Sequence, residues 1–439
     1  WVEDEKFSYD HHIKRIAVPS PGDREALGEV VSHLYAKHLD RSRPLWEIWF
    51  IEGLAGGRCA ILQKLHHGLM DGQGAMKLGE VMCDLEPGAA PRELESTIAD
   101  ARAGDAPEQW QQYVNAADHL SRIPGRVGRE MIDLLQSRVR KRFAGSAEVE
   151  QEKPPVPATF FNGDIGSDRG FVFASVPLAA VKKIKSHFEV TVNDVVLALV
   201  GTSLREYMLA IGELPQQSLR TNIAVSLRTE GDSEFSNRVT QTPVTLATDT
   251  ADPIDRLRAI HGESETAKRR AHGGGKSIVE VMQLMPPLAI SALANLTTPE
   301  QSAAMIGANL TVSNVRGNAQ PMYIAGARML TMYPMSLIAP GMGINVTCVS
   351  YAGNIDFGIT IDPRLFPAPW ALVDGLESAL SEYLALVAPQ RKARRKAPAR
   401  KPAAKKNTHR KPAKKKAKTT PKRPARRRQQ AASASAERS

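Results

Sequence analysis

The chain has 439 residues, more than one ordinary domain needs, and 42% of them are hydrophobic, which suits a globular protein with a sizeable core. Its net charge of +11 comes from the C-terminus: residues 391–439 hold 21 Lys and Arg against one acidic residue, whereas the rest of the chain holds 37 basic and 46 acidic residues. The longest apolar run, over 281–296, contains Gln283 and Pro286-Pro287, which excludes a membrane-spanning helix, and three widely separated cysteines exclude a disulfide framework.

The cysteines and the start of the chain bear on the cellular compartment. Cys59 and Cys348 lie in apolar runs typical of strands, so we expect both thiols to be buried and inert. Together with Cys83 they fit a reducing interior. No secretory signal is visible, and because the chain opens at Trp1 rather than Met, we expect an opening segment to be missing.

Helix and strand patterns alternate over the first part of the chain. Apolar residues recur at helical spacing over 27–35, and short apolar runs over 46–51 and 58–65 predict strands. A polar, helix-compatible stretch follows over 107–142. We therefore expect an N-terminal α/β domain over residues 1–145.

Two adjacent histidines stand directly after the second of these strands. Residues 66–72 read HHGLMDG, and the apolar residues that follow at spacings of three and four predict a helix that begins near Asp71. A turn from strand to helix can present an imidazole to a cleft. An imidazole titrates near neutral pH, so this placement suits general-base catalysis on a hydroxyl group.

A structural role for these histidines is one alternative, and a metal site is another. Adjacent strand residues point to opposite faces, so His66 and His67 cannot both ligate one ion, and we expect no metal. The same alternation predicts that one ring faces the cleft while the other is buried. We assign His67 as the base and His66 as its support, with Asp71 fixing the turn and Gly72 allowing the backbone to bend sharply.

A second mixed pattern begins after a Pro-, Gly- and Asp-rich segment over 146–170, which is typical of an exposed crossover between domains. We expect the second domain over 171–388. Thr191 and Asp194 have the spacing of a capping box at a helix start. Further helices are expected over 178–187 and 370–386. Strands are expected over 221–227, 241–247, 308–314, 322–332, 343–350 and 353–361.

The histidine string is one of four short motifs that follow each other in a fixed order. They are Pro44-Leu45-Trp46, residues 66–72, Asn193-Asp194 and Ser313-Asn314-Val315. The set resembles the bacterial, actinobacterial-type wax ester synthase/acyl-CoA:diacylglycerol acyltransferase family, within the CoA-dependent acyltransferase superfamily. The glycine-rich stretches 341–345 and 350–353 fit as well, so the resemblance spans about residues 1–388. Arg316 and Asn318 replace two prolines of the family motif.

The resemblance implies an α/β fold of two chloramphenicol-acetyltransferase-like domains with a channel at their interface, followed by a disordered basic tail over 389–439. It implies an acyl-CoA-dependent O-acyltransferase that forms triacylglycerol from diacylglycerol, wax ester from a long-chain alcohol, or both. No cofactor is expected, because acyl-CoA is itself the activated substrate. Transfer should be direct, because no G-x-S-x-G nucleophile motif accompanies the histidines.

The resemblance also implies roles for individual residues. His67 takes the proton of the alcohol. Contributions to substrate binding are implied for Gly72, Asn193, Asp194, Ser313 and Asn314. A helix N-terminus near Asn193 would favour the negative charge of a tetrahedral intermediate. Plain helix capping is the alternative for Asn193-Asp194, a simple strand end is the alternative for Ser313-Asn314, and we expect Trp46 to pack in the core.

The C-terminal tail alternates Lys and Arg with Ala and Pro and contains no aromatic residue, so we expect it to be disordered. Such a segment is attracted to an anionic membrane or lipid-droplet surface and binds nucleic acid phosphates non-specifically. We expect a cytoplasmic protein at the inner membrane face or on lipid droplets. Two alternatives are a condensation-type enzyme that takes its acyl group from a carrier protein, and an inactive paralogue that tethers lipid surfaces or nucleic acid.

Overall fold

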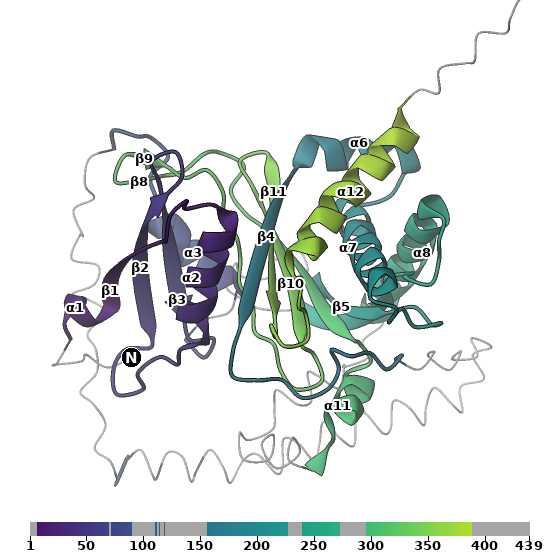
Figure 1. Cartoon of the computed structure of the whole chain (residues 1–439), viewed down its shortest axis with the longest axis horizontal. Coiled ribbons are helices and arrows are strands. Elements are labelled where there is room, and N and C mark those ends of the chain that lie inside the picture. The colour runs from purple at the N-terminus through teal and green to yellow at the C-terminus, as the bar shows by residue number, and fades with distance from the viewer. Residues whose placement is uncertain are drawn as a thin grey trace, which may run out of the picture. The chain divides into compact units, whose positions relative to one another are not determined.

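The computed structural model describes residues 7–69, 72–89, 110–111, 114, 118, 156–226, 239–272 and 296–388 (Figure 1). The chain divides into one compact unit, Trp1–Pro389, and a second, Gln390–Ser439, which lies outside the described residues. Asp71, most of 107–142 and the start of the crossover at 146–155 also lie outside them. What the sequence predicts for these residues, and for the domain boundary within the first unit, stays a prediction.

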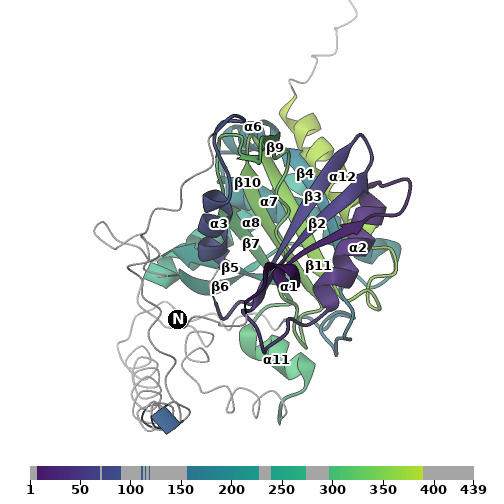
Figure 2. The same ribbon diagram turned by 90° about the vertical axis from the view of Figure 1, so that its left-hand side faces the viewer.

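A three-stranded sheet forms the N-terminal part and faces the viewer in Figure 2. Its strands, in the order β1-β2-β3, are β1 (Ile13–Ala17), β2 (Trp46–Leu54) and β3 (Arg58–Leu65). β1 runs parallel to β2, and β2 forms an antiparallel hairpin with β3. The helices of this part are α1 (Tyr9–His12), α2 (Arg24–Ala36) and α3 (Gly72–Val81). The predicted strands over 46–51 and 58–65 and the helix over 27–35 are confirmed, whereas the short β1 was not predicted.

A six-stranded mixed sheet, in the order β4-β11-β10-β7-β5-β6, forms the second part. Its strands are β4 (Gly170–Pro177), β5 (Arg220–Ser226), β6 (Val239–Thr245), β7 (Leu310–Arg316), β10 (Ile344–Tyr351) and β11 (Asn354–Ile361). Its helices are α6 (Leu178–Phe188), α7 (Val192–Ala210), α8 (Pro253–His272), α11 (Pro299–Ile306) and α12 (Trp370–Val387). The predicted strand over 322–332 is instead a small hairpin of β8 (Tyr323–Ile324) and β9 (Ala327–Arg328).

The two faces of the six-stranded sheet differ in character. One face is apolar and packs against α6, α7, α8 and α12, which lie together on one side of the sheet in Figure 1. On the opposite face, the strand registers align Asn222, Thr311, Asn345 and Thr360 in one row across four neighbouring strands. Because side chains alternate along a strand, this polar row lies opposite the hydrophobic core.

The two parts meet where α2 packs against β4. The amide of Phe171 donates to the Ser32 hydroxyl at 2.8 Å. Val31 and Leu34 share an apolar cluster with Phe171 and Phe173. Burial of these side chains stabilises the contact by about 1.5–3 kcal/mol each relative to exposure.

The expectation that two of the cysteines are buried is wrong for Cys59 and confirmed for Cys348. Cys59 is exposed because it is the second residue of β3, next to the turn from β2. The first two residues of this strand are both exposed. Cys348 lies in the core, and burial raises the pKa of its thiol. Among the described residues, no helix is long and apolar enough to cross a membrane.

Candidate active site

The β2–β3 hairpin places the two histidines beside the Pro44-Leu45-Trp46 segment. Trp46 pairs with Leu65 at the end of the hairpin, and the His66 amide donates to the Leu45 carbonyl at 3.0 Å. The spacing of about twenty residues between these two motifs is therefore the length of one hairpin. Trp46 stacks on His12 with ring centroids 4.4 Å apart, which agrees with a packing role for this tryptophan.

The histidines lie in the turn after β3 rather than in the strand. The Leu69 amide donates to the His66 carbonyl at 2.9 Å, and the Gly68 amide donates to Nδ1 of His66 at 3.0 Å. A ring nitrogen that accepts an N–H bond carries its lone pair, so the proton of the neutral His66 ring is on Nε2. His66 therefore braces the turn with its own side chain.

Both rings are exposed, so the expectation that one of them is buried is wrong. The reason is that β3 ends at Leu65, and the alternation of strand faces does not extend into the turn. Among the described residues, none forms a hydrogen bond with the ring of His67.

A buried lysine fixes β3, the strand that precedes the histidine turn. Lys64 is 8% exposed and donates from Nζ to the carbonyl of Leu34 at 2.8 Å and to that of Lys37. Burial lowers the pKa of this lysine. Its charge lies at the C-terminal end of α2, where a cation is favoured by the helix dipole.

Helix α3, which follows the histidine turn, reaches the loop after β7. The methyl carbon of Met76 lies 3.3 Å from the position that a Cβ on Gly317 would take. The Gly317 amide donates to the Ser350 carbonyl at 3.1 Å. The loop directly after the Ser313-Asn314-Val315 motif and the helix after the histidines thus lie close together, although the prolines of the family motif are replaced.

Two motifs that lie 121 residues apart in the sequence meet at the start of α7. Nδ2 of Asn314 donates to Oδ1 of Asn193 at 3.4 Å. The predicted capping box is confirmed, because the Thr191 hydroxyl accepts from the Asp194 amide while the Asp194 carboxylate accepts from the Thr191 amide. Asp194 thus caps α7, while its neighbour Asn193 contacts Asn314.

Ser313 and Asn314 point to different faces of the sheet. Ser313 pairs in register with Thr347 on the polar face, whereas Asn314 lies beside α7. The structure therefore brings Asn193 and Asn314 together but leaves Ser313 on the other side of β7.

A residue that the sequence did not single out completes this region. Nδ1 of His261, on α8, lies 2.8 Å from Oδ2 of Asp194, which is fully buried. Burial raises the pKa of Asp194, but hydrogen bonds from His261 and Thr191 outweigh it, so the pKa lies below its ordinary value. No local motif marks His261, because its partner lies 67 residues away.

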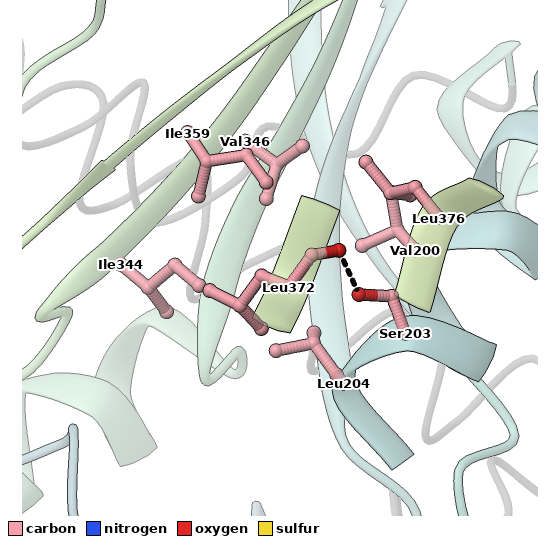
Figure 3. Close-up of a pocket in the computed structure, with 8 residues that line it drawn as sticks. All are labelled: Val200, Ser203, Leu204, Ile344, Val346, Ile359, Leu372 and Leu376. Carbon is pink, nitrogen blue, oxygen red and sulfur yellow. Dashed lines mark hydrogen bonds between the residues drawn. The ribbon is translucent and has the colours of Figure 1, made fainter. Parts of the chain in front are cut away.

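A small cavity of about 10 Å³ lies between α7, α12 and strands β10 and β11, as Figure 3 shows. The hydroxyl of Ser203 on its wall donates to the Leu372 carbonyl at 2.6 Å. It has room for about one water molecule and contains none of the predicted site residues, so we treat it as a void in the core. Among the described residues, no group of three or more His, Cys, Asp or Glu side chains could hold a metal ion.

Comparison with known proteins agrees with these motifs. A family model described as the wax ester synthase/diacylglycerol acyltransferase catalytic domain matches residues 1–196, and the model of the C-terminal domain of the same family matches residues 235–383. A putative diacylglycerol O-acyltransferase of Mycobacterium tuberculosis is 31% identical over 399 residues, which cover 88% of this chain and 76% of the relative.

Another M. tuberculosis protein, described as a probable diacylglycerol O-acyltransferase, is 33% identical over 408 residues, 90% of this chain and 83% of its own. The solved structure of a wax ester synthase/diacylglycerol acyltransferase from Marinobacter aquaeolei superposes with a TM-score of 0.64 at 28% identity. It covers 88% of this chain and 82% of its own. Fold and motifs define an acyltransferase of mixed α/β architecture. The chain belongs to the wax ester synthase/diacylglycerol acyltransferase family.

Proposed function

We propose that this enzyme transfers an acyl group from acyl-CoA to the hydroxyl of diacylglycerol, of a long-chain alcohol, or of both. The products are triacylglycerol and wax ester. Membership of the family favours acyl-CoA as donor over a carrier protein. The thioester of acyl-CoA is already activated toward attack, whereas the acceptor hydroxyl is not, so the protein has to supply a base and a site for the developing negative charge.

The difference between the two histidines is the observation that carries the assignment of the base. Nδ1 of His66 already accepts the Gly68 amide, and Nε2 carries the proton of its neutral ring. Protonation of His66 at Nδ1 would therefore break its bond to the Gly68 amide. The exposed His67 ring forms no hydrogen bond with a described residue. This difference favours His67 as the base and His66 as the residue that supports it.

The reaction then proceeds without an acyl-enzyme. His67 takes the proton of the acceptor hydroxyl, and the oxygen attacks the thioester carbonyl. The resulting tetrahedral oxyanion collapses, the carbon–sulfur bond breaks, and the CoA thiolate takes the proton from the His67 imidazolium. Asn193 is our candidate donor to the oxyanion, because its Oδ1 accepts from Asn314 and its Nδ2 is therefore the group left to donate.

The remaining predicted residues support this arrangement. Asp71 and Gly72 are proposed to fix and bend the turn between the histidines and α3. Asp194 fixes the first turn of α7, next to Asn193. Ser313 belongs to the polar face of the six-stranded sheet. We propose that this face lines an interface channel, because its hydroxyl and amide groups suit the polar parts of acyl-CoA and of the acceptor.

The choice of acceptor is tested by parallel assays of the purified chain with palmitoyl-CoA and either dioleoylglycerol or hexadecanol. Triacylglycerol, wax ester or both are expected, and the product identifies the acceptor class. An intact, folded chain that forms ester with neither acceptor would contradict the proposed reaction. That result would favour a lipid-surface tether.

The basic tail is proposed to hold the enzyme at an anionic membrane or lipid-droplet surface at the cytoplasmic side. Each cation near an acidic membrane contributes roughly 1 kcal/mol at moderate salt. The 21 basic residues over 391–439 supply this attraction, and an enzyme that makes insoluble esters works at such a surface. Non-specific binding of nucleic acid is the second candidate for this segment, because its attraction to phosphates has the same electrostatic origin.

A further inference from the structure

His261 joins α8 to the first turn of α7 through a buried carboxylate. Its Nδ1 lies 2.8 Å from Oδ2 of Asp194, and a carboxylate of lowered pKa can only accept, so Nδ1 carries the proton of this bond. Asp194 is fully buried while the side chain of His261 is 35% exposed. A buried carboxylate needs such partners, because an unpaired charge in the core is strongly destabilising.

The same carboxylate oxygen also fixes the backbone at the start of α7. Oδ2 of Asp194 accepts from the Thr191 amide at 2.9 Å, and the Asp194 amide donates to the Thr191 hydroxyl at 3.2 Å. Asn193 lies inside this hydrogen-bonded turn. Loss of the bond from His261 would leave Asp194 to find another partner and would loosen the segment that carries Asn193.

Asn193 in turn faces the end of β7. Its Oδ1 accepts from Asn314 at 3.4 Å, a long and therefore weak bond for an amide pair. This contact alone is too weak to hold Asn193 in one orientation. The stronger restraint on the Asn193 backbone is the turn that Asp194 and His261 fix from the other side of α7.

We propose that His261 is a positioning residue for acyl transfer, which holds the first turn of α7 through Asp194 so that the Asn193 amide points at the developing oxyanion. This inference rests on the proposed function. His261 itself does not touch substrate in this account, and its effect on the rate passes through Asn193.

The first experiment compares His261→Leu and His261→Gln with His261→Asn in the full-length enzyme. Asparagine places an N–H close to the Nδ1 position of histidine, whereas the glutamine amide lies one bond farther out and leucine has no donor. We expect kcat to fall about tenfold in the first two variants, less than the roughly 100-fold cost of losing a whole oxyanion donor. The KM for palmitoyl-CoA should stay within twofold, and His261→Asn should restore most of the rate.

A matched control separates this effect from general damage. His187 is an exposed histidine on α6 that contacts Phe188 and no carboxylate among the described residues, so His187→Leu should leave kcat unchanged. Should His261→Leu fold poorly, His261→Gln carries the comparison. Equal kcat values in wild type, His261→Gln and His261→Leu would overturn the proposal.

A double-mutant cycle then tests the route through Asn193. In an Asn193→Ala background, His261→Gln should change kcat less than twofold, because the residue through which it acts is gone. An undiminished tenfold loss in that background would overturn the proposal. A wild-type enzyme that forms no ester would instead contradict the proposed function, so the two failures can be told apart.

Discussion

The Gly68 amide donates to Nδ1 of His66 at 3.0 Å, whereas the ring of the neighbouring His67 forms no hydrogen bond among the described residues. Two identical side chains thus acquire different chemistry from the turn in which they lie. A similar division occurs at the start of α7, where Asp194 is buried and fixed while Asn193 is half-buried and contacts Asn314. In both places one residue holds the local backbone in place, and its neighbour remains available to contact substrate.

Replacing Asp194 with Asn tests this division through the pH dependence of stability. The hydrogen bonds of Asp194 lower its pKa in the folded protein. The ionised carboxylate therefore stabilises the fold at pH values above the unfolded-state pKa of about 3.8, and this contribution is lost as the pH falls through the folded-state pKa. We expect Asp194→Asn to lower the free energy of unfolding at pH 7 by about 1–2 kcal/mol.

Urea unfolding of wild type and Asp194→Asn at several pH values measures the effect. The difference between the two proteins should be full at pH 7 and should shrink as pH falls below the unfolded pKa of about 3.8 toward the lower folded pKa. A difference that stays constant over this range would show that the carboxylate charge does not contribute.

The sequence predicts the members of the site better than their arrangement. Short motifs reveal His66, His67, Asn193 and Asn314, because each pattern is local. The exposure of both histidines depends on the residue at which β3 ends, which periodicity does not define to one position. The bond between His261 and Asp194 joins residues 67 positions apart and has no local signal at all.

At the scale of elements, α7 is the helix on which the second part is built. It is buried over most of its length and packs against α12 and α8. Gly201 allows its close approach to the chain after β6, since a Cβ at this position would lie 2.5 Å from the Leu246 carbonyl oxygen. The position of Asn193 therefore depends on a tight contact two turns further along the same helix.

Gly201→Ala should destabilise the protein by about 1–3 kcal/mol, because the clash with the Leu246 carbonyl exceeds the gain in helix propensity. Gly262→Ala on α8 is the matched control, since a Cβ there meets no atom within 4 Å. This exposed helical glycine should give a gain of about 0.5–1 kcal/mol on replacement. Thermal unfolding of both variants measures the two signs, and a stabilising Gly201→Ala would contradict the packing described for α7.

Elements with a clear local period were predicted, and those that depend on tertiary burial were not. The alternating or apolar runs of β3, β10 and β11 and the capping box of α7 are visible in the sequence. β4 shows no alternation because consecutive residues on both of its faces, 171–174, are buried. α8 is too polar to show an apolar stripe, and buried polar residues such as Arg256, which donates to Thr202, hold it in place.

At the scale of the whole molecule, charge is divided unevenly between residues 1–390 and the C-terminal segment 391–439. Residues 1–390 carry more acidic than basic side chains, whereas 391–439 carry 21 basic residues and one acidic residue. The proposed attraction to an anionic surface would therefore reside in residues 391–439, outside the described residues. Catalysis and surface attachment should be separable.

Removal of residues 391–439 tests this separation. The truncated enzyme should keep its activity on detergent-dispersed substrate, because the predicted catalytic residues all precede the tail. Its binding to phosphatidylserine-containing vesicles should weaken, and the binding of the full chain should fall steeply with salt. Unchanged sedimentation with these vesicles after truncation would contradict a membrane role for the tail. Binding of a DNA duplex by the full chain but not by the truncated chain would favour the nucleic acid alternative.

The central claim, that His67 is the base for acyl transfer to a hydroxyl, is tested most directly by ester formation from palmitoyl-CoA in His67→Ala. His33→Ala is the matched control, because the ring of His33 bonds to the Glu29 carbonyl on the exposed side of α2. We predict a fall in kcat of about 10²–10⁴-fold for His67→Ala, with an unchanged unfolding midpoint, and no change for His33→Ala. A folded His67→Ala enzyme that keeps most of its activity would contradict this account.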